Sequence, residues 1–430
     1  MNRWCTQAWG MALAAAVCLA SCTVASAAGS HTGRAGPAAA PPAACHVTIC
    51  AAPAASLADQ PVTIKINGLP PGARASVRLR SVDADGVAWS SSAVFRASSA
   101  GLIDPARTAA LSGSYTGVSA MGLFWSMQPR GPHPDGAYSW SYTRAASFEV
   151  SVAVSGRVRA SATLSRRLSA TRITAEPKRV AATGFYGEFF SPAVTGRRPA
   201  VLVFGGSAGG FSLGGPSTTL LAAMLAAHGY PALALAYFRA PGLPQGPGFI
   251  PLEYFAKALR WLRGQPHVDP RHVVTLGISH GSEAAQLLGA YYPGLVNGVI
   301  ASVPNYRAFP YTWTLHGRPV PAPANPVIPV ERIKGPVFLD CGGADHVLRS
   351  CPNARAIMTR LAAHHDAYQR VFYAYPAAGH GVGSLMPYQP VADTAQGPAL
   401  AGASANANPD AQARLWPHLL QFLAGLSPAR

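Results

Sequence analysis

The sequence predicts an antiparallel β-sandwich followed by an α/β module with a mostly parallel sheet. In residues 45–170, short segments alternate apolar and polar side chains, and turns rich in Gly, Pro and Asp separate them. From about residue 185 onwards, solid apolar runs alternate with helix-like segments, which is typical of a parallel sheet covered by helices on both faces. A chain of 430 residues leaves room for both modules, since domains average roughly 150 residues.

The expected strands of the first module, residues 45–170, have the period-two pattern of strands with one buried face. Turn sequences at Gly68–Gly72 and Asp83–Gly86 follow two of them. The expected strands are Pro61–Asn67, Ala75–Val82, Val94–Ala97, Phe148–Val154 and Val158–Leu164.

The second module, residues 171–430, alternates buried strands with helices. The expected strands are Ala200–Phe204, Pro231–Tyr237, Val273–Gly277, Val296–Ser302, Pro336–Asp340 and Val371–Tyr375. The expected helices are Thr218–His228, Leu252–Arg263, Ser282–Ala290 and Asn353–His364.

Residues 1–22 have the features of a secretory signal: a basic start and an apolar stretch too short to span a membrane. The tetrapeptide Leu19–Cys22 resembles the lipobox of bacterial lipoproteins, in which Cys22 would be lipidated; cleavage after Ala27 is the alternative. Residues 23–44, rich in Ala, Pro and Gly, predict a flexible tether. We therefore expect an exported bacterial protein of the cell envelope or periplasm, lipid-anchored or otherwise secreted, that meets a membrane only through this anchor.

Four cysteines remain beyond the signal and the lipidation candidate, in two sequence-local pairs. Cys45 lies near Cys50, and Cys341 lies near Cys351. Such pairs suit an oxidising compartment, so both are disulfide candidates. Four unpaired thiols are the alternative, because sequence does not fix connectivity.

The net charge of +17 invites a nucleic-acid interpretation, which the distribution of charge does not support. The 34 Lys and Arg residues are spread singly, without a basic run of about five to eight residues and without helix-turn-helix or zinc-finger spacing. We therefore expect no nucleic-acid partner. Hydrophobic residues at 49% and charged residues at 12% also exclude a mostly disordered polyelectrolyte.

The most informative motif is G-I-S-H-G at residues 277–281, which directly follows an expected strand and opens an expected helix. This is the setting of the nucleophile elbow in α/β-hydrolases, where a sharp turn presents Ser279 above the sheet. Helix N-cap is the alternative role of Ser279. Residues 210–214 also match G-x-S-x-G, but Ser212 lies well beyond the strand that ends at Phe204, so a plain loop is expected there.

A nucleophilic serine needs a histidine base and a carboxylate, which in α/β-hydrolases follow in the order Ser, acid, His. Asp345 lies on a loop just past a strand end, where active sites of open α/β sheets gather, and Asp340 is the alternative acid. His380 follows the last core strand closely enough to reach over the sheet and is the expected base. His280 is expected to pack or to line the entrance.

The oxyanion hole is expected to use the backbone N–H of His280 and N–H groups of Gly206 and Ser207 in the glycine-rich loop after the first buried strand. Glycines let that backbone approach the developing oxyanion closely. A phosphate-binding loop is excluded because no Gly-Lys-Ser/Thr follows.

With these landmarks in place, the chain resembles the acyl-CoA thioesterase / bile acid-CoA:amino acid N-acyltransferase family over roughly residues 55–425. The resemblance rests on ordered matches in both modules: Pro61–Ile64, Gly117, Met121–Met127, Phe204–Gly206, Gly209–Gly210, Ala232–Tyr237, Ile250–Phe255, Leu276–Ser279, Ile328–Glu331 and Tyr375-Pro-x-x-Gly379-His380. It implies a β-sandwich packed on an α/β-hydrolase, with Ser279, Asp345 and His380 in the triad positions.

The resemblance implies a serine hydrolase that cleaves an acyl thioester such as an acyl-CoA through an acyl-enzyme. Family acyltransferases that conjugate amino acids carry Cys at the nucleophile position, so Ser279 favours hydrolysis. We expect a small-molecule substrate, no cofactor and no metal site. Hydrolysis of a carboxylic ester, acyl transfer to an amine or alcohol, and binding by an idle scaffold in the cell envelope remain alternatives, because CoA thioesters are cytosolic whereas export is expected.

Overall fold

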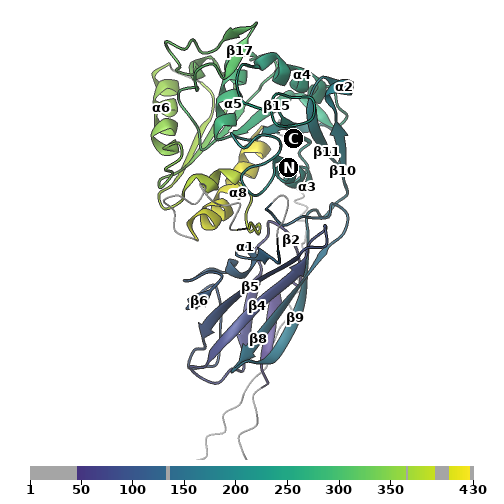
Figure 1. Cartoon of the computed structure of the whole chain (residues 1–430), viewed down its shortest axis with the longest axis vertical. Coiled ribbons are helices and arrows are strands. Elements are labelled where there is room, and N and C mark those ends of the chain that lie inside the picture. Colours follow the sequence, from purple (N-terminus) through teal and green to yellow (C-terminus); the bar gives the residue numbers. More distant parts are fainter. Residues whose placement is uncertain (1–45, 132–135, 365–366, 393–405, 427–430) are drawn as a thin grey trace, which may run out of the picture.

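Two modules lie end to end in the computed structural model, the β-rich one below and the helix-rich one above in Figure 1. The structure describes residues 46–131, 136–364, 367–392 and 406–426. The expected signal, the lipidation candidate Cys22, the tether and Cys45 lie outside the described residues. No helix within the described ranges is long and apolar enough to cross a bilayer.

Alternating burial builds the β-rich module. In Arg74–Val82 (β4), every second side chain is buried, so Val77 and Leu79 face the core whereas Arg78 and Arg80 face solvent. The sheet has the strand order β2-β9-β8-β4-β5-β6, with β7 pairing beside β5. Its other strands are Ala55–Leu57 (β2), Ala88–Arg96 (β5), Ser112–Gly113 (β6), Gln128–Pro129 (β7), Ala146–Val154 (β8) and Arg157–Arg167 (β9).

A second, two-stranded sheet of Thr48–Ala52 (β1) and Thr63–Asn67 (β3) completes the sandwich. Ile64 and Ile66 of β3 belong to the same core cluster as Trp89 and Phe95 of β5. The antiparallel prediction was wrong for one pair, since β2 runs parallel to β9. The reason is that β2 and β9 lie far apart in the chain. No hairpin turn joins them, so nothing requires the two strands to run in opposite directions.

The second module is an eight-stranded sheet with the order β10-β11-β13-β12-β15-β16-β19-β20. All neighbouring pairs from β13 to β20 are parallel. At one edge, β11 is antiparallel to both of its neighbours, β10 and β13. This is the mostly parallel α/β-hydrolase arrangement that the sequence predicted. The strands are Ile173–Lys178 (β10), Tyr186–Pro192 (β11), Arg198–Phe204 (β12), Ala232–Ala236 (β13), Val268–Ile278 (β15), Val299–Ser302 (β16), Val337–Gly342 (β19) and Arg370–Tyr375 (β20).

Helices cover both faces of this sheet, as the solid apolar strands require. Val201 and Val203 of β12 share one core cluster with α3 and α8, whereas Leu202 shares the other with α4, α5 and α6. The helices are Thr218–Ala227 (α3), Leu252–Arg263 (α4), His280–Tyr291 (α5), Ser350–Ala363 (α6) and Ala407–Gly425 (α8). The expected helices are all present within a few residues of their expected bounds, while α8, β10 and β11 were not predicted.

Short helices and strands lie in the loops of both modules. They are Gly122–Trp125 (α1), Val180–Thr183 (α2), Ile250–Pro251 (β14), Trp313–Leu315 (β17), Arg318–Pro319 (β18), Val330–Arg332 (η1) and His380–Ser384 (η2). Among them, η2 holds the expected base, and α1 lies at the end of the β-rich module that faces α8 (Figure 1).

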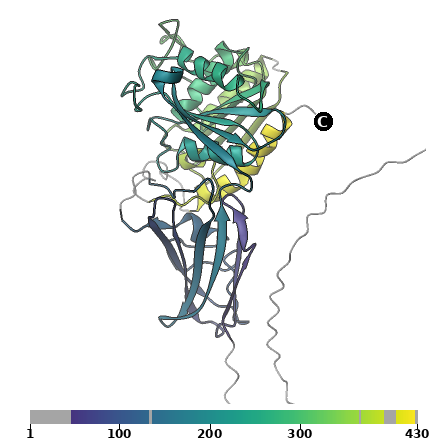
Figure 2. The ribbon, with the colours of Figure 1, turned by 90° about the vertical axis from the view of Figure 1, so that its right-hand side faces the viewer.

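The junction between the modules, which we call the seam, is held by hydrogen bonds from several segments. Asp59 of the β-rich module accepts from His228 Nε2 at 2.5 Å and from Trp416 Nε1 of α8 at 2.7 Å. On the other side, Trp140 Nε1 donates to Gln389 Oε1 at 2.6 Å. Figure 2 shows α8, in yellow, reaching down to this junction. The seam therefore ties α8 and the segment after η2 to the β-rich module.

Arg166 fixes the loop that carries Asp59. Its guanidinium is buried and donates to the carbonyl oxygens of Leu57, Ala58 and Gln60 at 3.0, 2.8 and 2.7 Å. It also lies over the ring of Phe124 at 4.7 Å. A buried charge is stable when its donors are satisfied, and these carbonyls satisfy it. Arg166 thereby presents Asp59 to the other module.

Candidate active site

Ser279 lies at a sharp turn between β15 and α5. Its φ of 58° and ψ of −124° place a non-glycine residue in strained backbone. The turn is tight on both sides: a Cβ at Gly277 would lie 2.1 Å from the Gly281 oxygen, and a Cβ at Gly281 would lie 2.3 Å from the Gly205 oxygen. Only glycine fits these two positions. The local sequence therefore forms the strand–turn–helix that presents a serine hydroxyl above a sheet.

The ring of His380 bridges Ser279 and Asp345. Ser279 Oγ lies 2.9 Å from His380 Nε2, and His380 Nδ1 lies 2.9 Å from Asp345 Oδ2. Since an ionised carboxylate only accepts, Nδ1–H donates to Asp345 and Nε2 is left to accept the serine proton. The three residues come from separate segments: the elbow, the loop after β19, and η2 after β20.

Asp345 is held as an anion. Burial raises the pKa of this carboxyl, but the hydrogen bond and charge of His380 outweigh burial, and the pKa falls to about 2. Backbone N–H groups of Val347 and Leu348 add bonds to Oδ1 at 2.9 and 3.1 Å. This carboxylate can therefore orient His380 and stabilise its protonated form.

The alternative acid, Asp340, occupies a different place. It lies within β19, buried, and its Oδ1 accepts from Ser302 Oγ at 2.8 Å. Its Oδ2 has no hydrogen-bond partner among the described residues, and burial raises its pKa to about 7. The carboxyl group next to His380 is that of Asp345.

The expected oxyanion donors lie around Ser279. A Cβ on Gly206 would come within 2.9 Å of the Ser279 Cβ and 3.2 Å of Oγ, so the backbone of the loop after β12 passes directly over the hydroxyl. Ser207 follows Gly206 in the chain and lines the cavity that opens beside Ser279. His280 is the first residue of α5, and N–H groups in the first turn of a helix have no acceptor within that helix. Its N–H is thus available to an oxyanion.

The His280 side chain points away from Ser279 into the protein. It is buried, and its ring stacks on Trp313 at 5.0 Å, while Nδ1 lies 3.4 Å from the Tyr237 hydroxyl. Burial lowers the pKa of His280 to about 4, so the ring is neutral near pH 7. The Tyr237 hydroxyl in turn donates to the Gly205 oxygen at 3.0 Å, which supports the loop after β12 from below.

Sequence reasoning missed the role of Glu283. This residue lies on α5, fully buried, and accepts from Asn305 Nδ2 at 2.6 Å, Phe309 N at 3.1 Å and Trp313 Nε1 at 2.8 Å. Its Oε2 is also 4.0 Å from His280 Nε2. Burial raises the pKa of Glu283 to about 7 although all three donors lower it. A glutamate one turn into a helix in which Ala and Leu predominate is the signal that could have revealed it.

A cavity of about 310 Å³ opens beside Ser279. Its wall includes His380, the loop after β12 with Gly206 and Ser212, and the apolar side chains of Leu213 and Val347. Ser212 therefore lies on a loop of the cavity wall, as expected, and not at an elbow. A larger hollow of about 880 Å³ lies over β4 and β5 of the β-rich module. None of its described wall residues belongs to the second module, so the larger of these two spaces is not the one beside Ser279.

Cys341 and Cys351 form a disulfide with their Cα atoms 5.0 Å apart. The bond joins the end of β19 to the start of α6 and closes the loop that contains Asp345. The second candidate pair, Cys45 with Cys50, lies partly outside the described residues, because Cys45 does.

Comparison with known protein families gives two matches that together span most of the chain. Residues 59–179 match the acyl-CoA thioester hydrolase/BAAT N-terminal region. Residues 250–312 and 318–426 match the BAAT / acyl-CoA thioester hydrolase C-terminal region.

Similar curated proteins include both hydrolases and acyltransferases. Acyl-coenzyme A thioesterase 1 of Rattus norvegicus is 30% identical over 361 residues, which cover 75% of this chain and 82% of that protein. Acyl-coenzyme A amino acid N-acyltransferase 2 of Mus musculus is 27% identical over 427 residues, covering 87% and 97%.

Among solved structures, a dienelactone hydrolase-like promiscuous phosphotriesterase from metagenomic libraries is 20% identical, with a TM-score of 0.41 over 60% of this chain and 99% of that one. An alpha/beta hydrolase enzyme from a deep-sea metagenome library is 16% identical, with a TM-score of 0.41 over 59% and 98%.

Proposed function

Because the chain belongs to the acyl-CoA thioester hydrolase/BAAT family, we propose that it is a serine hydrolase that cleaves an acyl thioester such as an acyl-CoA. Ser279 is the nucleophile, His380 the base and Asp345 the orienting acid. The observation that carries this proposal is the ring of His380, which lies 2.9 Å from the Ser279 hydroxyl on one side and 2.9 Å from the Asp345 carboxylate on the other. This is the geometry that a serine nucleophile needs.

Acylation starts when Ser279 Oγ attacks the thioester carbonyl carbon and passes its proton to His380 Nε2. The carbonyl oxygen becomes an oxyanion, to which the N–H groups of His280, Gly206 and Ser207 are the candidate donors. The tetrahedral intermediate then expels the thiolate, which takes the proton from His380. The acyl group remains on Ser279 as an ester. Asp345 stabilises the histidinium formed between the two proton transfers.

Deacylation repeats these steps with water. His380 Nε2 takes a proton from the water as its oxygen attacks the acyl-enzyme carbonyl, and the same donors hold the second oxyanion. Ser279 Oγ leaves with the proton from His380, releasing the carboxylic acid. The free enzyme is restored, and no cofactor takes part in this cycle.

The test uses a fluorophosphonate probe and a turnover panel of acyl-CoAs and nitrophenyl esters. We expect the wild type to be labelled and to hydrolyse members of the panel, whereas Ser279→Ala does neither. Ser212→Ala is the matched control, because it removes the other serine in a G-x-S-x-G sequence, and it should be labelled like the wild type. Unlabelled wild type without turnover would favour the idle binding scaffold and overturn the proposal.

Acyl transfer is the second candidate, supported by the likeness to amino acid N-acyltransferases over 87% of this chain. In that reaction an amine nitrogen replaces water in the attack on the acyl-enzyme, and an amide is released. The two candidates differ in their product. Adding amino acids to the turnover assay and identifying the acyl products by mass spectrometry separates them, since hydrolysis releases the acyl group only as the free acid.

We also propose that the protein acts outside the cytosol, on an acyl thioester or on a carboxylic ester found in the cell envelope. The sequence of residues 1–22 supports export, and the Cys341–Cys351 disulfide suits an oxidising compartment. Mass spectrometry of the mature N-terminus provides the test. A lipidated Cys22 or a start after Ala27 supports export by either route, and an uncleaved cytosolic chain contradicts it.

A further inference from the structure

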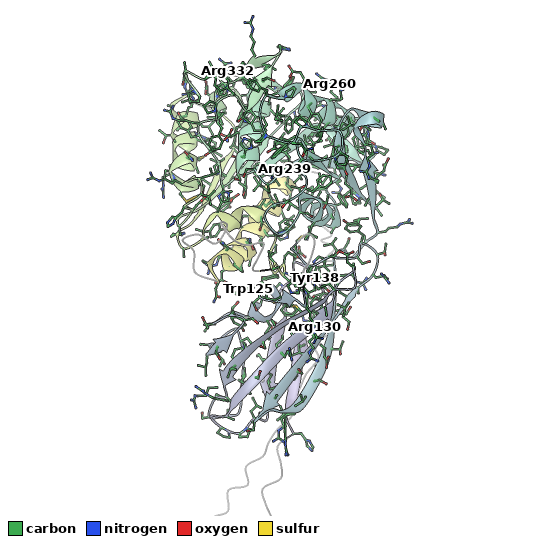
Figure 3. All side chains as sticks on the ribbon, viewed as in Figure 1. Trp125, Arg130, Tyr138, Arg239, Arg260 and Arg332 are labelled. Carbon is green, nitrogen blue, oxygen red and sulfur yellow. A yellow bond between two sulfur atoms is a disulfide. The ribbon has the colours of Figure 1, made fainter. Side chains whose placement is uncertain are left out.

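A second cavity, of about 60 Å³, lies next to the one beside Ser279. Its wall comes from both modules: Trp125 ends α1 of the β-rich module, Met386 follows η2, and Pro409 lies on α8. Figure 3 shows Trp125 at the end of the β-rich module that faces α8. We call this space the seam cavity, because it lies where the two modules meet.

The seam cavity adjoins the cavity beside Ser279. Leu213, Gly214, Gly381 and Ser384 belong to the walls of both. Gly381 directly follows the base His380 and lies in η2. The two cavities therefore meet at Leu213, with Ser279 in the wall of one and Trp125 in the wall of the other.

Polar side chains in the wall of the seam cavity are already bonded within the protein. The Gln412 amide donates to the Gly381 oxygen at 2.8 Å and to Ser384 Oγ at 2.7 Å. The Gln389 amide donates to the Pro387 oxygen at 2.9 Å, and its oxygen accepts from Trp140. A ligand with polar atoms would lose its bonds to water here without replacing them.

The apolar part of the wall suits a hydrocarbon. Trp125, Leu213, Pro216, Met386, Val391 and Pro409 supply carbon surface to the cavity. The Trp125 ring is held in place, since Nε1 donates to Ser119 Oγ at 3.2 Å and the ring packs 5.7 Å from that of Tyr115. A rigid aromatic ring at the far end of a narrow space acts as a stop.

We propose that the seam cavity receives the distal end of the substrate's acyl chain, so that Trp125 of the β-rich module limits the length of chain that the hydrolase module accepts. This rests on the proposed function, in which the acyl carbonyl is bonded to Ser279. The occupant is a straight-chain fatty acyl group, because a space of about 60 Å³ beyond Leu213 admits a few methylenes and excludes a ring system. The β-rich module thereby becomes part of the substrate site.

The experiment measures kcat/KM of the full-length chain for nitrophenyl esters from acetyl through octanoyl to palmitoyl. Active enzyme is counted by titration with fluorophosphonate, which corrects for misfolded protein. Trp125→Ala enlarges the seam cavity, and Trp125→Phe is a milder change that tests the same position if alanine impairs folding. Leu213→Trp narrows the space where the two cavities meet. Trp89→Phe is the matched control, because Trp89 is a buried tryptophan of the same module that does not line the seam cavity.

We expect Trp125→Ala to move the optimum to longer chains, raising the ratio of long-chain to short-chain kcat/KM by about tenfold or more, since one methylene in an apolar pocket changes discrimination by roughly that factor. Leu213→Trp should lower the same ratio, and Trp89→Phe should leave it unchanged. Turnover that depends on Ser279 but has the same chain-length profile in all variants overturns this inference and leaves the proposed function standing. Absence of any Ser279-dependent turnover overturns both.

Discussion

Two histidine–carboxylate pairs flank Ser279, and their surroundings differ. In the outer pair, His380 lines the cavity and its Nδ1 lies 2.9 Å from the buried Asp345 carboxylate. In the inner pair, His280 and Glu283 both lie inside the protein, with Nε2 and Oε2 4.0 Å apart. The histidine lowers the pKa of Asp345 to about 2, while burial raises that of Glu283 to about 7.

The same two residue types therefore serve two purposes. A charge-assisted bond at the cavity edge keeps Asp345 ionised, so its carboxylate can hold the His380 ring in place. Deep burial against Trp313 leaves His280 neutral, so its side chain supports the turn by packing. Distance and burial decide which histidine can act as a base. Four of the five predictions below change one member of these pairs, and the other removes the disulfide.

The largest effect is expected for His380→Phe, which removes the proposed base. The kcat should fall on the order of 10⁶-fold, as for loss of a catalytic histidine in serine hydrolases. Steady-state kinetics on the best ester or thioester of the panel measures it. If kcat fell as much in His280→Phe as in His380→Phe, the conclusion that only His380 acts as a base would be contradicted.

Next comes Asp345→Asn, which keeps the shape of the acid but removes its charge. The amide would favour the wrong tautomer of His380, and kcat should fall on the order of 10⁴-fold. Asp340→Asn is the matched control, since its carboxyl bonds to Ser302, and its kcat should stay far closer to that of the wild type. Equal losses in both variants would contradict the assignment of the acid.

Glu283 should give the protein a distinctive dependence of stability on pH. Its pKa rises from 4.5 to about 7 on folding, so between these values the folded protein retains a proton that the unfolded chain has released. The contribution of Glu283 to the free energy of unfolding is therefore lost as pH rises from about 4.5 to about 7, by up to about 3 kcal/mol.

Denaturant unfolding of wild type and Glu283→Gln at about pH 5 and about pH 7.5 tests this contribution. The wild type should lose more stability over this interval than the variant. Asp340, whose pKa burial also raises to about 7, is present in both proteins and cancels in the difference. Parallel pH profiles for the two proteins would show that Glu283 is ionised in the folded state throughout.

The disulfide should affect the outer pair, His380 and Asp345, and leave the inner pair, His280 and Glu283, unchanged. Replacing Cys341 and Cys351 by serine removes a short cross-link, which should lower the free energy of unfolding by about 2–3 kcal/mol and reduce turnover, because the loop that holds Asp345 gains freedom. Circular dichroism should report an intact sheet. Turnover that is unchanged in the variant and in reductant would show that packing alone positions Asp345.

The smallest effect is expected for His280→Phe. The phenyl ring can stack on Trp313 as the imidazole does, and only the contact with Tyr237 is lost. The kcat should fall less than about tenfold, in line with a net loss of about 1 kcal/mol for a neutral hydrogen bond. Thermal unfolding of the same variant serves as the control for its folding. A much larger fall would assign the imidazole itself a part in the chemistry.

The sequence predicts the outer pair through signals that are local and ordered along the chain. The elbow is a short motif between a strand and a helix, and parallel strands bring the loops that carry Asp345 and His380 to the same sheet edge. The scarcity of carboxylates then reduced the choice of acid to Asp345 and Asp340. The geometry around His380 agrees with the first choice.

The inner pair and the seam could not be predicted in the same way. Glu283 meets donors on a segment some twenty to thirty residues away, whose path after β16 follows no regular pattern. Asp59 and Trp416 are hydrogen-bonded although most of the chain separates them in sequence. The helix that carries Trp416 also contains Pro417, a residue that usually interrupts helices, so its sequence predicts a helix only weakly. Such contacts depend on how the modules pack, which periodicity does not encode.

Helix α8 bears on the order in which the molecule is built. Its Asn408 accepts from the Gly379 N–H beside the base, its Gln412 bonds to η2, and its Trp416 bonds to Asp59 of the other module. During synthesis the β-rich module and most of the large sheet leave the ribosome before this helix does. The site beside Ser279 and the seam therefore become complete at a late step of biogenesis, when residues 407–425 dock. Until then the nascent chain carries Ser279 without the contacts from α8 that fix η2 and the segment around His380.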